Sequence, residues 1–261
     1  MDIRLNSIDK GNAFDWGRTS ADYAKFRDIY PEEFYRYITD RGLCIKGQKV
    51  LDIGTGTGVL PRNMYRFGAD WTGADISEGQ IEQAKILSEG MDIDYIAAPA
   101  EKLGFPDESF DVITACQCYW YFDHKTTAPV LSRMLKKGGS FLMLMMNWLP
   151  FEDNIAAASE ELVLKYNPDW SGGGEKVHPV AVSEEYLPYF DVVHTSEFLL
   201  DVPFTREKWN GRMKACRGVG ASLPPEKIEE WEKEHIAMLE EMTPVEFTVK
   251  HFAAVAQLRK K

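Results

Sequence analysis

Two acidic side chains flank a glycine-rich turn, and the second stands where it could hold the ribose of a nucleoside. Asp52 lies two residues before Gly54, the first of three glycines spaced as G-x-G-x-G, and Asp75 follows about 20 residues after that glycine. A carboxylate at the end of a strand can accept hydrogen bonds from both hydroxyl groups of a ribose. The glycines remove side chains where the backbone must turn sharply and a ligand must approach it. This spacing predicts a nucleoside-binding site.

The residues around the glycines predict the elements that position this site. Residues 50–53 are mostly apolar, which is typical of a strand buried on both faces. After the glycines, apolar residues recur at helical spacing from Val59 to Phe67, and Gly68 ends the helix. The first turn of such a helix offers unpaired N–H groups and a positive dipole end to an anionic group.

The spacing of the glycines also bears on the kind of nucleotide. The dinucleotide fingerprint G-x-G-x-x-G would need its third glycine at the position of Val59. A G-K-[ST] phosphate-binding loop is absent from the sequence. A Rossmann-type oxidoreductase that binds NAD(P) is therefore the alternative interpretation rather than the first one.

The glycine segment resembles motif I of the class I S-adenosylmethionine-dependent methyltransferases, of the small-molecule type that includes the UbiE-like and trans-aconitate methyltransferase-like enzymes. Residues 69–77 resemble the second strand of that family, which ends in the ribose-binding acid. Residues 105–113 match the family's F-P-D-x-S-F-D-x-V turn, and residues 98–103 resemble its D-A-x-x-L loop, with Pro99 in place of the usual acid. The resemblance covers residues 23–148 well and the rest of the chain loosely.

This resemblance implies S-adenosyl-L-methionine as the cofactor and a set of residues that bind it. The implied cofactor-binding residues are Tyr23, Asp52, Gly54, Thr55, Gly56, Gly58, Asp75, Ile76, Gln80, Ala100, Glu101 and Gln117.

The chemistry expected of such a site is an in-line methyl transfer to a small-molecule acceptor. The sulfonium group already activates the methyl group, so the protein need only align the acceptor and exclude water. Aromatic faces stabilise a sulfonium cation, and the candidates for the substrate pocket are Trp16, Trp120, Tyr121 and Trp148. Trp120 stands where some relatives carry a histidine, so we identify no catalytic base, and we expect no metal site. A cofactor-binding module with a regulatory role is a second alternative.

Composition limits the classes of partner. The chain has 30 basic and 41 acidic residues and a formal net charge of −11, which disfavours general binding to nucleic acid or anionic membranes. Residues 1–16 lack the apolar core of a signal peptide, and the longest apolar run, residues 141–146, is too short to span a bilayer. Four cysteines without a regular framework favour a reducing, cytoplasmic location. The sequence does not indicate the oligomeric state.

The alternation of strands and helices predicts an α/β fold. The resemblance implies a Rossmann-like, seven-stranded, mostly parallel sheet with an antiparallel last strand and helical lid insertions. We expect an N-terminal helical cap over residues 1–46 and a cofactor-binding core over 47–150. Residues 151–261 would supply the remaining strands and the lid helices within one continuous domain. Finer expectations are a helix over 128–137, ended by Gly138 and Gly139, and another over 151–166.

Overall fold

The computed structural model describes residues 3–19 and 24–261 of the chain. Contacts divide the chain into two compact units. Unit 1 comprises Met1–Ile29, Asn147–Val177 and Leu199–Phe252, and unit 2 comprises Tyr30–Met146, His178–Phe198 and Ala253–Lys261. Unit 2 contains most of the sheet, and unit 1 is mainly helical but also contains residues 147–148, 199–205 and 246–252 of the last three strands.

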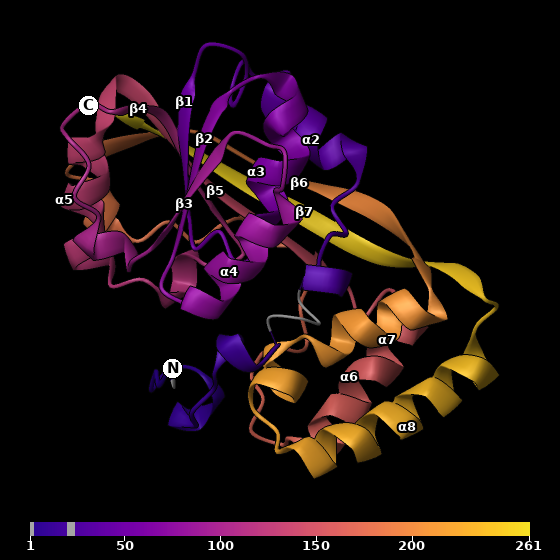
Figure 1. The fold of residues 1–261 in the computed structure, drawn as a ribbon. Helices are drawn as coiled ribbons and strands as arrows, with labels where there is room; N and C mark the ends of the chain where they lie inside the picture. The colour runs from indigo at the N-terminus through magenta and orange to yellow at the C-terminus, as the bar shows by residue number, and fades with distance from the viewer. Residues whose placement is uncertain (1–2, 20–23) are drawn as a thin grey trace. The chain divides into compact units, whose positions relative to one another are not determined.

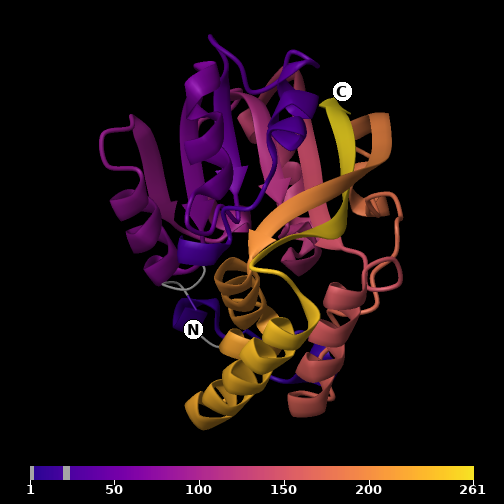
Figure 2. The same ribbon diagram turned by 90° about the vertical axis from the view of Figure 1, so that its right-hand side faces the viewer.

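In the described part of the chain, seven strands form one sheet in the order β3-β2-β1-β4-β5-β7-β6 (Figure 1). Strands β3, β2, β1, β4 and β5 pair in parallel, and the last strands run antiparallel, as the sequence predicts. Figure 2 shows β6 and β7, in orange and yellow, side by side. The strands are β1 Lys49–Ile53, β2 Asp70–Asp75, β3 Ile93–Ala97, β4 Phe110–Cys116, β5 Leu135–Trp148, β6 Phe190–Thr205 and β7 Glu246–Lys260.

Helices flank the parallel strands on both sides. Figure 1 shows α5 on one side and α3 and α4 on the other, so β1 in the middle of the sheet is covered on both faces. This explains why residues 50–53 are all buried and why their sequence is nearly continuously apolar. The α-helices of unit 2 are α2 Glu32–Thr39, α3 Val59–Met64, α4 Glu78–Leu87 and α5 His124–Met134.

Both boundaries expected for the helix over 128–137 are wrong by several residues. Helix α5 begins at His124, because the Asp123 side chain accepts a hydrogen bond from the Lys125 amide, and it ends at Met134 rather than at residue 137. Leu135 already has extended backbone angles, so the two lysines that follow belong to strand β5. Gly138 lies inside that strand with a φ of 74°.

Side-chain caps begin two of the described helices of unit 1, and the sequence only partly signals these caps. Asp153 accepts hydrogen bonds from the amides of residues 155 and 156, so α6 spans Asn154–Tyr166 and begins three residues later than expected. Thr205 caps α7 Arg206–Lys214, and a proline in the first turn opens α8 Pro225–Met242. The π-helix η7 spans Arg217–Ala221. Short 3₁₀-helices elsewhere in the chain are η1 Asp9–Gly11, η2 Trp16–Thr19, η3 Tyr65–Phe67, η4 Ala100–Lys102, η5 Tyr119–Tyr121 and η6 Glu184–Tyr186.

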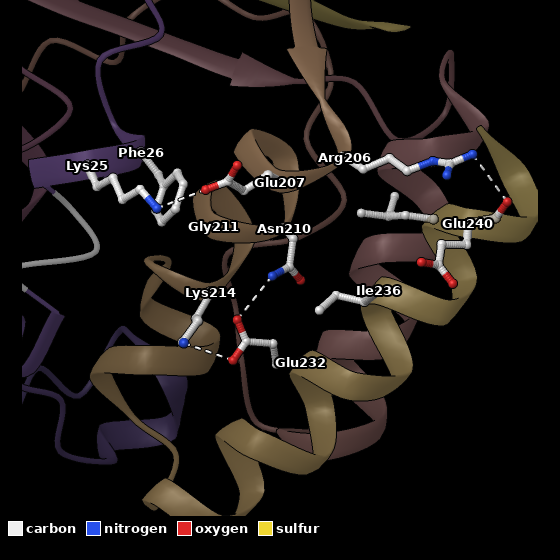
Figure 3. A pocket seen from close by; sticks show the side chains of 11 residues that line it. Lys25, Phe26, Arg206, Glu207, Asn210, Gly211, Lys214, Glu232, Ile236 and Glu240 are labelled. Carbon is white, nitrogen blue, oxygen red and sulfur yellow. Dashed lines mark hydrogen bonds and ion pairs between the residues drawn. The ribbon is translucent and has the colours of Figure 1, made fainter. Parts of the chain in front are cut away.

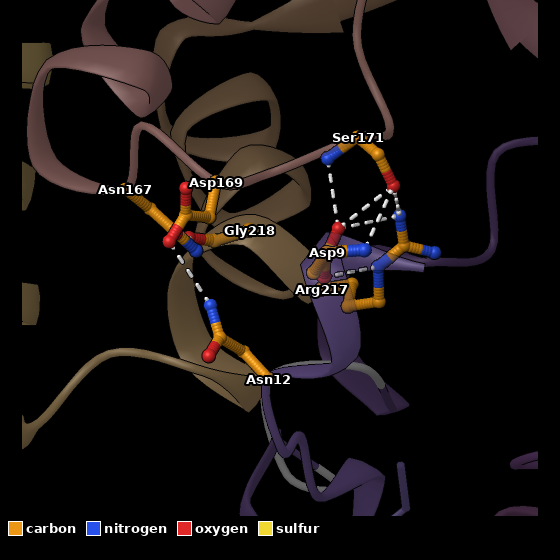
Figure 4. Close-up of polar contacts among 7 residues, drawn as sticks. All are labelled: Asp9, Asn12, Asn167, Asp169, Ser171, Arg217 and Gly218. Atoms are coloured by element: carbon orange, nitrogen blue, oxygen red, sulfur yellow. Dashed lines mark hydrogen bonds and ion pairs between the residues drawn. The ribbon is translucent and has the colours of Figure 1, made fainter. Parts of the chain in front are cut away.

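A buried ion pair ties the first described residues to the rest of unit 1 (Figure 4). The Asp9 carboxylate is nearly inaccessible and lies 2.7 Å from Nε of Arg217, at the start of η7. Oδ1 of Asp9 also accepts hydrogen bonds from the amide and hydroxyl of Ser171, at 2.7 and 2.9 Å. Three segments that are far apart in the sequence therefore converge on one carboxylate.

Candidate functional site

The bend after β1 contains the three glycines and follows a path that side chains would block. Gly54, Gly56 and Gly58 all have positive φ, at 63°, 56° and 73°. A Cβ atom on Gly58 would lie 2.9 Å from Cζ of Tyr95, and one on Gly54 would lie 2.6 Å from Sγ of Cys118. Glycine is therefore needed here both for the backbone conformation and for close packing.

The Asp75 carboxylate lies against this bend. Its Oδ2 accepts a hydrogen bond from the Gly56 amide at 2.9 Å, and its Oδ1 accepts one from the Ser77 amide, also at 2.9 Å. Burial raises the pKa of Asp75 above its usual value, while these two amides oppose that shift. A carboxylate has about four acceptor sites, so both oxygens keep capacity for further donors such as hydroxyl groups.

Hydrogen bonds also join the carboxyl ends of neighbouring strands. The Thr55 amide donates to Ala74 O at 3.0 Å, which connects the end of β1 to the end of β2. The Ala98 amide donates to Asp75 O at 2.8 Å, which connects the segment after β3 to the end of β2. The predicted positions after the first three strands thus lie at one edge of the sheet, where open α/β sheets bind ligands.

Asp52 is buried in β1 beside a hydroxyl group that sequence reasoning missed. Thr114 is its register partner on β4, and the Thr114 hydroxyl donates to Oδ1 of Asp52 at 2.6 Å. Burial raises the pKa of Asp52 to about 7, against the opposing effect of the Thr114 hydrogen bond and with a further rise from the charge of Asp75. Thr114 is a polar residue within the apolar run 112–115, which marks it as unusual, but only the register between β1 and β4 shows that it meets Asp52.

The other residues expected at the cofactor lie on the segments that follow β2 and β3. Gln80 is buried in the first turn of α4, and its amide donates to the Ser77 hydroxyl at 3.4 Å, so Ser77 caps this helix. Ile76 follows Asp75 directly and is 44% exposed, so it presents apolar surface beside the carboxylate. Ala100 is buried and Glu101 is half-buried, and both lie on η4.

Gln117 lies at the end of β4 in a strained backbone conformation. Its φ of 61° is in the left-handed region, which non-glycine residues seldom adopt. Its amide donates to Leu144 O at 2.9 Å, and its side-chain nitrogen donates to Met146 O. Cys118 follows, and its thiol donates to Ile53 O at 3.1 Å. Such strain persists only where the surroundings hold it in place, and it concentrates at functional sites.

The aromatic candidates for the substrate pocket lie in different surroundings. Trp120 and Tyr121 are half-buried on η5 in unit 2, with their ring centroids 5.6 Å apart. Trp148 belongs to unit 1 and is nearly buried, and its Nε1 donates to Oε1 of Glu160 at 2.6 Å. Trp16 is half-buried on η2, also in unit 1. Tyr23 lies outside the described residues.

Unit 1 contains a separate cavity of about 460 Å³ between α7 and α8 (Figure 3). Its lining is partly apolar, with Phe26 and Ile236, and its rim carries exposed charged side chains such as Lys25 and Glu207. The Lys25 ammonium lies 2.8 Å from the Glu207 carboxylate, and the Lys214 ammonium lies 2.8 Å from the Glu232 carboxylate. These internal pairs neutralise much of the rim charge, and we assign no ligand to this cavity.

Two further features of the described residues bear on the kind of protein. They contain no group of three or more His, Cys, Asp or Glu side chains placed to hold a metal ion. None of their helices combines the length and the apolar character that a membrane crossing requires.

Comparison with known sequences defines the class of protein. Residues 51–143, which contain the glycine bend and Asp75, match the family model described as a methyltransferase domain. The chain is 31% identical over 157 residues to a ubiquinone biosynthesis O-methyltransferase from Pseudomonas entomophila, a match that covers 59% of this chain and 67% of that protein. A protein of the same name from Brucella anthropi is 36% identical over 134 residues, which cover 50% of this chain and 54% of that protein. For several such relatives, the matched region is about half of their length.

The chain belongs to the class I S-adenosylmethionine-dependent methyltransferases, as its glycine bend and sheet order predict. Solved structures confirm the fold. A candidate type II methyltransferase from Anaeromyxobacter dehalogenans has a TM-score of 0.59 and 21% identity, over 88% of this chain and 96% of that one. The YcgJ protein from Bacillus subtilis has a TM-score of 0.52 and 19% identity, over 88% and 99% of the two chains.

The residues of this chain fit the family's cofactor. The bend offers side-chain-free backbone at three positions, and the Asp75 oxygens have acceptor capacity for two ribose hydroxyl groups. The exposed side chain of Ile76 offers apolar surface of the kind that an adenine ring covers. S-Adenosyl-L-methionine is accordingly the cofactor of this methyltransferase.

Proposed function

We propose that this protein transfers the methyl group of S-adenosylmethionine to a small-molecule acceptor, and that the adenosine part binds at the edge of the sheet that carries Asp75. The contact between Asp75 Oδ2 and the Gly56 amide carries the proposal. That contact holds a carboxylate and a bare backbone turn against each other, so one nucleoside could bind to both. The names of the relatives, which are O-methyltransferases of ubiquinone biosynthesis, support a small-molecule acceptor.

In the proposed site each residue has a defined role. Asp75 accepts from the ribose hydroxyl groups, and its hydrogen bonds to Gly56 and Ser77 hold it in position for this. Ile76 packs against one face of the adenine ring, and η4, with Ala100 and Glu101, borders the ring edge. The glycine bend admits the chain that leads to the methionine end, and the N-terminus of α3 favours the carboxylate of that end.

The remaining expected residues support the strands that carry these contacts. Asp52 and Thr114 brace the strand before the bend, and Gln117 supports the end of β4. The bound sulfonium supplies an activated methyl group, which can react with an acceptor that is held in line and shielded from water. Tyr23, Trp16, Trp120, Tyr121 and Trp148 remain candidates for contact with the cofactor or the acceptor.

Isothermal titration calorimetry tests the cofactor site directly. We expect S-adenosylhomocysteine to bind with a micromolar dissociation constant and NAD not to bind. Asp75→Ala should weaken that binding at least tenfold, because it removes the ribose acceptor. Asp70→Ala is the matched control, since Asp70 is an exposed carboxylate at the opposite end of the same strand, and it should leave binding unchanged. Binding of NAD in place of S-adenosylhomocysteine would contradict the proposal.

A methyl-transfer assay separates an enzyme from a regulatory module that merely binds the cofactor. Incubation with S-adenosylmethionine carrying a labelled methyl group and a library of small metabolites should label at least one acceptor. The proposal includes a cytoplasmic location, which is supported by the four free cysteines. It also excludes general binding to nucleic acid, which is supported by the net charge of −11.

A further inference from the structure

Four polar side chains that are not among the residues expected at the cofactor meet between α2 and β6 of unit 2. The members of this group, which we call the Tyr37 cluster, are Tyr37 of α2, Arg41 two residues after α2, and His194 and Ser196 of β6. Nε2 of His194 lies 2.7 Å from the Tyr37 hydroxyl and 2.7 Å from Nη2 of Arg41. The Tyr37 hydroxyl also shares a hydrogen bond with the Ser196 hydroxyl. The cluster thus joins two segments that are more than 150 positions apart in the sequence.

The two close contacts of Nε2 cannot both be good hydrogen bonds. A guanidinium only donates, so the contact with Arg41 requires the lone pair of a neutral imidazole. Nε2 has one such lone pair, and the Tyr37 hydroxyl competes for it. If Nε2 instead carries a proton and donates to Tyr37, that proton faces an N–H group of Arg41. An additional oxygen acceptor beside Arg41 would remove this conflict in either case.

The positive charge of Arg41 is not balanced by a carboxylate. The carboxylates next to the cluster in the sequence, Asp40 and Glu197, are exposed, and in the described part of the chain neither they nor any other acid forms an ion pair with Arg41. The guanidinium instead lies 4.1 Å from the centroid of the Tyr37 ring, in a cation–π contact. Its charge is therefore available to an anion from solution.

His194 responds to the same charge. Burial, followed by the charge of Arg41, lowers the pKa of His194 below its usual value. The other titratable side chain against it is Tyr37, which is neutral at physiological pH. An anion beside Arg41 would offset the charge of the guanidinium and so favour the protonated imidazole.

Small solutes can reach the cluster directly from solvent. Arg41 is exposed, and Tyr37, His194 and Ser196 are half-buried. The ring of Tyr37 stacks on that of Phe198, with centroids 4.7 Å apart and planes inclined by 25°, so the ring is held while its hydroxyl stays accessible. The polar atoms are therefore both positioned and open to a small anion.

We propose that the Tyr37 cluster binds a phosphate group, either as free phosphate or as part of a phosphorylated small molecule. The planar guanidinium of Arg41 donates a pair of hydrogen bonds to two phosphate oxygens, and the Ser196 hydroxyl donates to the phosphate as well. Once Arg41 has turned to the phosphate, Nε2 of His194 takes up a proton and supplies a second positive charge. This site uses none of the residues expected at the cofactor, so it does not depend on the proposed function.

Proton NMR of the His194 imidazole tests the site, with the signal assigned by its loss in His194→Gln. Sulfate is the first probe, because it keeps two negative charges throughout the titration, whereas phosphate itself titrates near neutral pH. In sodium sulfate the pKa of His194 should be about 1 unit higher than in sodium chloride of equal ionic strength. The exposed His178 is the internal control and should titrate alike in both salts. Equal pKa values of His194 in the two salts would overturn the proposal.

Calorimetric titration of the full chain distinguishes the sources of the phosphate group. Inorganic phosphate should bind at least tenfold more tightly than acetate, which has one negative charge and only two oxygens. Tighter binding of phenyl phosphate than of inorganic phosphate identifies a phosphorylated small molecule whose body packs beside Phe198, whereas equal binding identifies free phosphate. Acetate that binds as tightly as phosphate would overturn the proposal.

A pair of arginine variants assigns the binding to the cluster. Arg41→Met keeps a long side chain against the Tyr37 ring but removes the charge, so it should weaken phosphate binding at least tenfold and raise the pKa of His194 in chloride. Arg36→Met removes the same charge from an exposed position of α2, where it pairs with Glu32 at 3.1 Å, and should change neither quantity. Equal losses of phosphate binding in both variants would show attraction to the general surface charge and would overturn the proposal.

A milder variant and the cofactor site keep this test separate from folding. Ser196→Ala removes one donor and should weaken phosphate binding severalfold, and unchanged binding in both Ser196→Ala and Arg41→Met would overturn the proposal. Circular dichroism and S-adenosylhomocysteine affinity should be unchanged in both variants, because neither side chain contacts Asp75 or the glycine bend. Loss of S-adenosylhomocysteine binding in the unmodified chain, with phosphate binding intact, would contradict the proposed function and leave this site standing.

Discussion

The Thr114 hydroxyl donates a hydrogen bond to the Asp52 carboxylate across the pair of parallel strands β1 and β4, at 2.6 Å. Both side chains are buried, so this hydrogen bond is the main local interaction that offsets the loss of hydration of the Asp52 carboxylate. The hydrogen bond offsets this loss only in part, because the pKa of Asp52 is still raised to about 7, first by burial and then by the charge of Asp75. The strand that leads into the glycine bend therefore contains an acid that titrates near neutral pH.

The stability of the protein should depend on pH through Asp52. In the unfolded chain this carboxyl loses its proton near pH 3.8, whereas in the folded chain it does so near pH 7. Between these values the folded state binds more protons, so its stability falls as the pH rises and is constant above pH 7. Asp52→Asn does not titrate and accepts the same Thr114 hydrogen bond. We expect its free energy of unfolding, relative to the unmodified protein, to increase by about 2–3 kcal/mol from pH 5 to pH 8 in urea titrations. If the difference in unfolding free energy between the two proteins did not change with pH, this prediction would be wrong.

Substitution of Gly58 should cost more than its backbone angle alone explains. Its φ is 73°, and a Cβ atom would lie 2.9 Å from Cζ of Tyr95. Gly90 is a matched control in the same unit, because its φ is 84° and a Cβ atom there would meet nothing within 4 Å. Gly90→Ala should therefore destabilise by about 1 kcal/mol, and Gly58→Ala by about 2–4 kcal/mol. Gly58→Ala should also weaken S-adenosylhomocysteine binding. Equal losses of stability for Gly58→Ala and Gly90→Ala in urea unfolding would contradict this prediction. They would show that the Tyr95 side chain moves aside at no cost in free energy.

The bend and the ribose acid could be predicted because their signals are local. Strand, glycines and helix lie within about 20 residues, and the distance to Asp75 follows from the length of one βα unit. The Thr114 partner of Asp52 could not be found in this way, since it depends on the register between β1 and β4. The same holds for Tyr95, which reaches Gly58 from β3.

The predictions for unit 1 were weaker for a related reason. Its helices could be located, but caps such as Asp153 shifted their ends. Some of its contacts join residues more than 150 positions apart, such as Asp9 with Ser171. No periodicity in the sequence encodes such contacts.

Acid should destabilise the protein through His235. This buried side chain stacks on Trp231 with ring centroids 4.5 Å apart, and burial lowers its pKa to about 3. Below pH 6.5 the unfolded chain binds a proton that the folded chain does not, so stability is lost as the pH falls from 6.5 towards 3.

The variant His235→Gln tests this acid sensitivity. It removes the titrating group, so its stability should fall about 2 kcal/mol less than that of the unmodified protein between pH 7 and pH 5. His178→Gln changes an exposed histidine and is the control. Identical pH profiles for the unmodified protein and His235→Gln in guanidinium titrations would refute the assignment.

The buried ion pair of unit 1 should contribute far more to the stability of the protein than an exposed ion pair a few residues away. The Arg217 and Asp9 side chains are 11% and 3% exposed (Figure 4). The ring of Phe14 lies 5.8 Å from the guanidinium of Arg217. Arg217→Met leaves the Asp9 carboxylate buried without its counter-charge, which should cost about 3–5 kcal/mol. Lys10→Met breaks the Lys10–Asp169 pair, whose side chains are 76% and 39% exposed, and should cost less than about 1 kcal/mol.

Thermal and urea unfolding measure both losses, and the combined substitution separates charge from packing. If the cost of Arg217→Met comes from the stranded carboxylate, then adding Asp9→Asn should restore part of the lost stability. Salt should reduce the small effect of Lys10→Met and leave that of Arg217→Met nearly unchanged, because buried charges are poorly screened. A double variant as unstable as the sum of the two single variants would mean that Arg217 stabilises unit 1 through its packing on Phe14 and not through its charge.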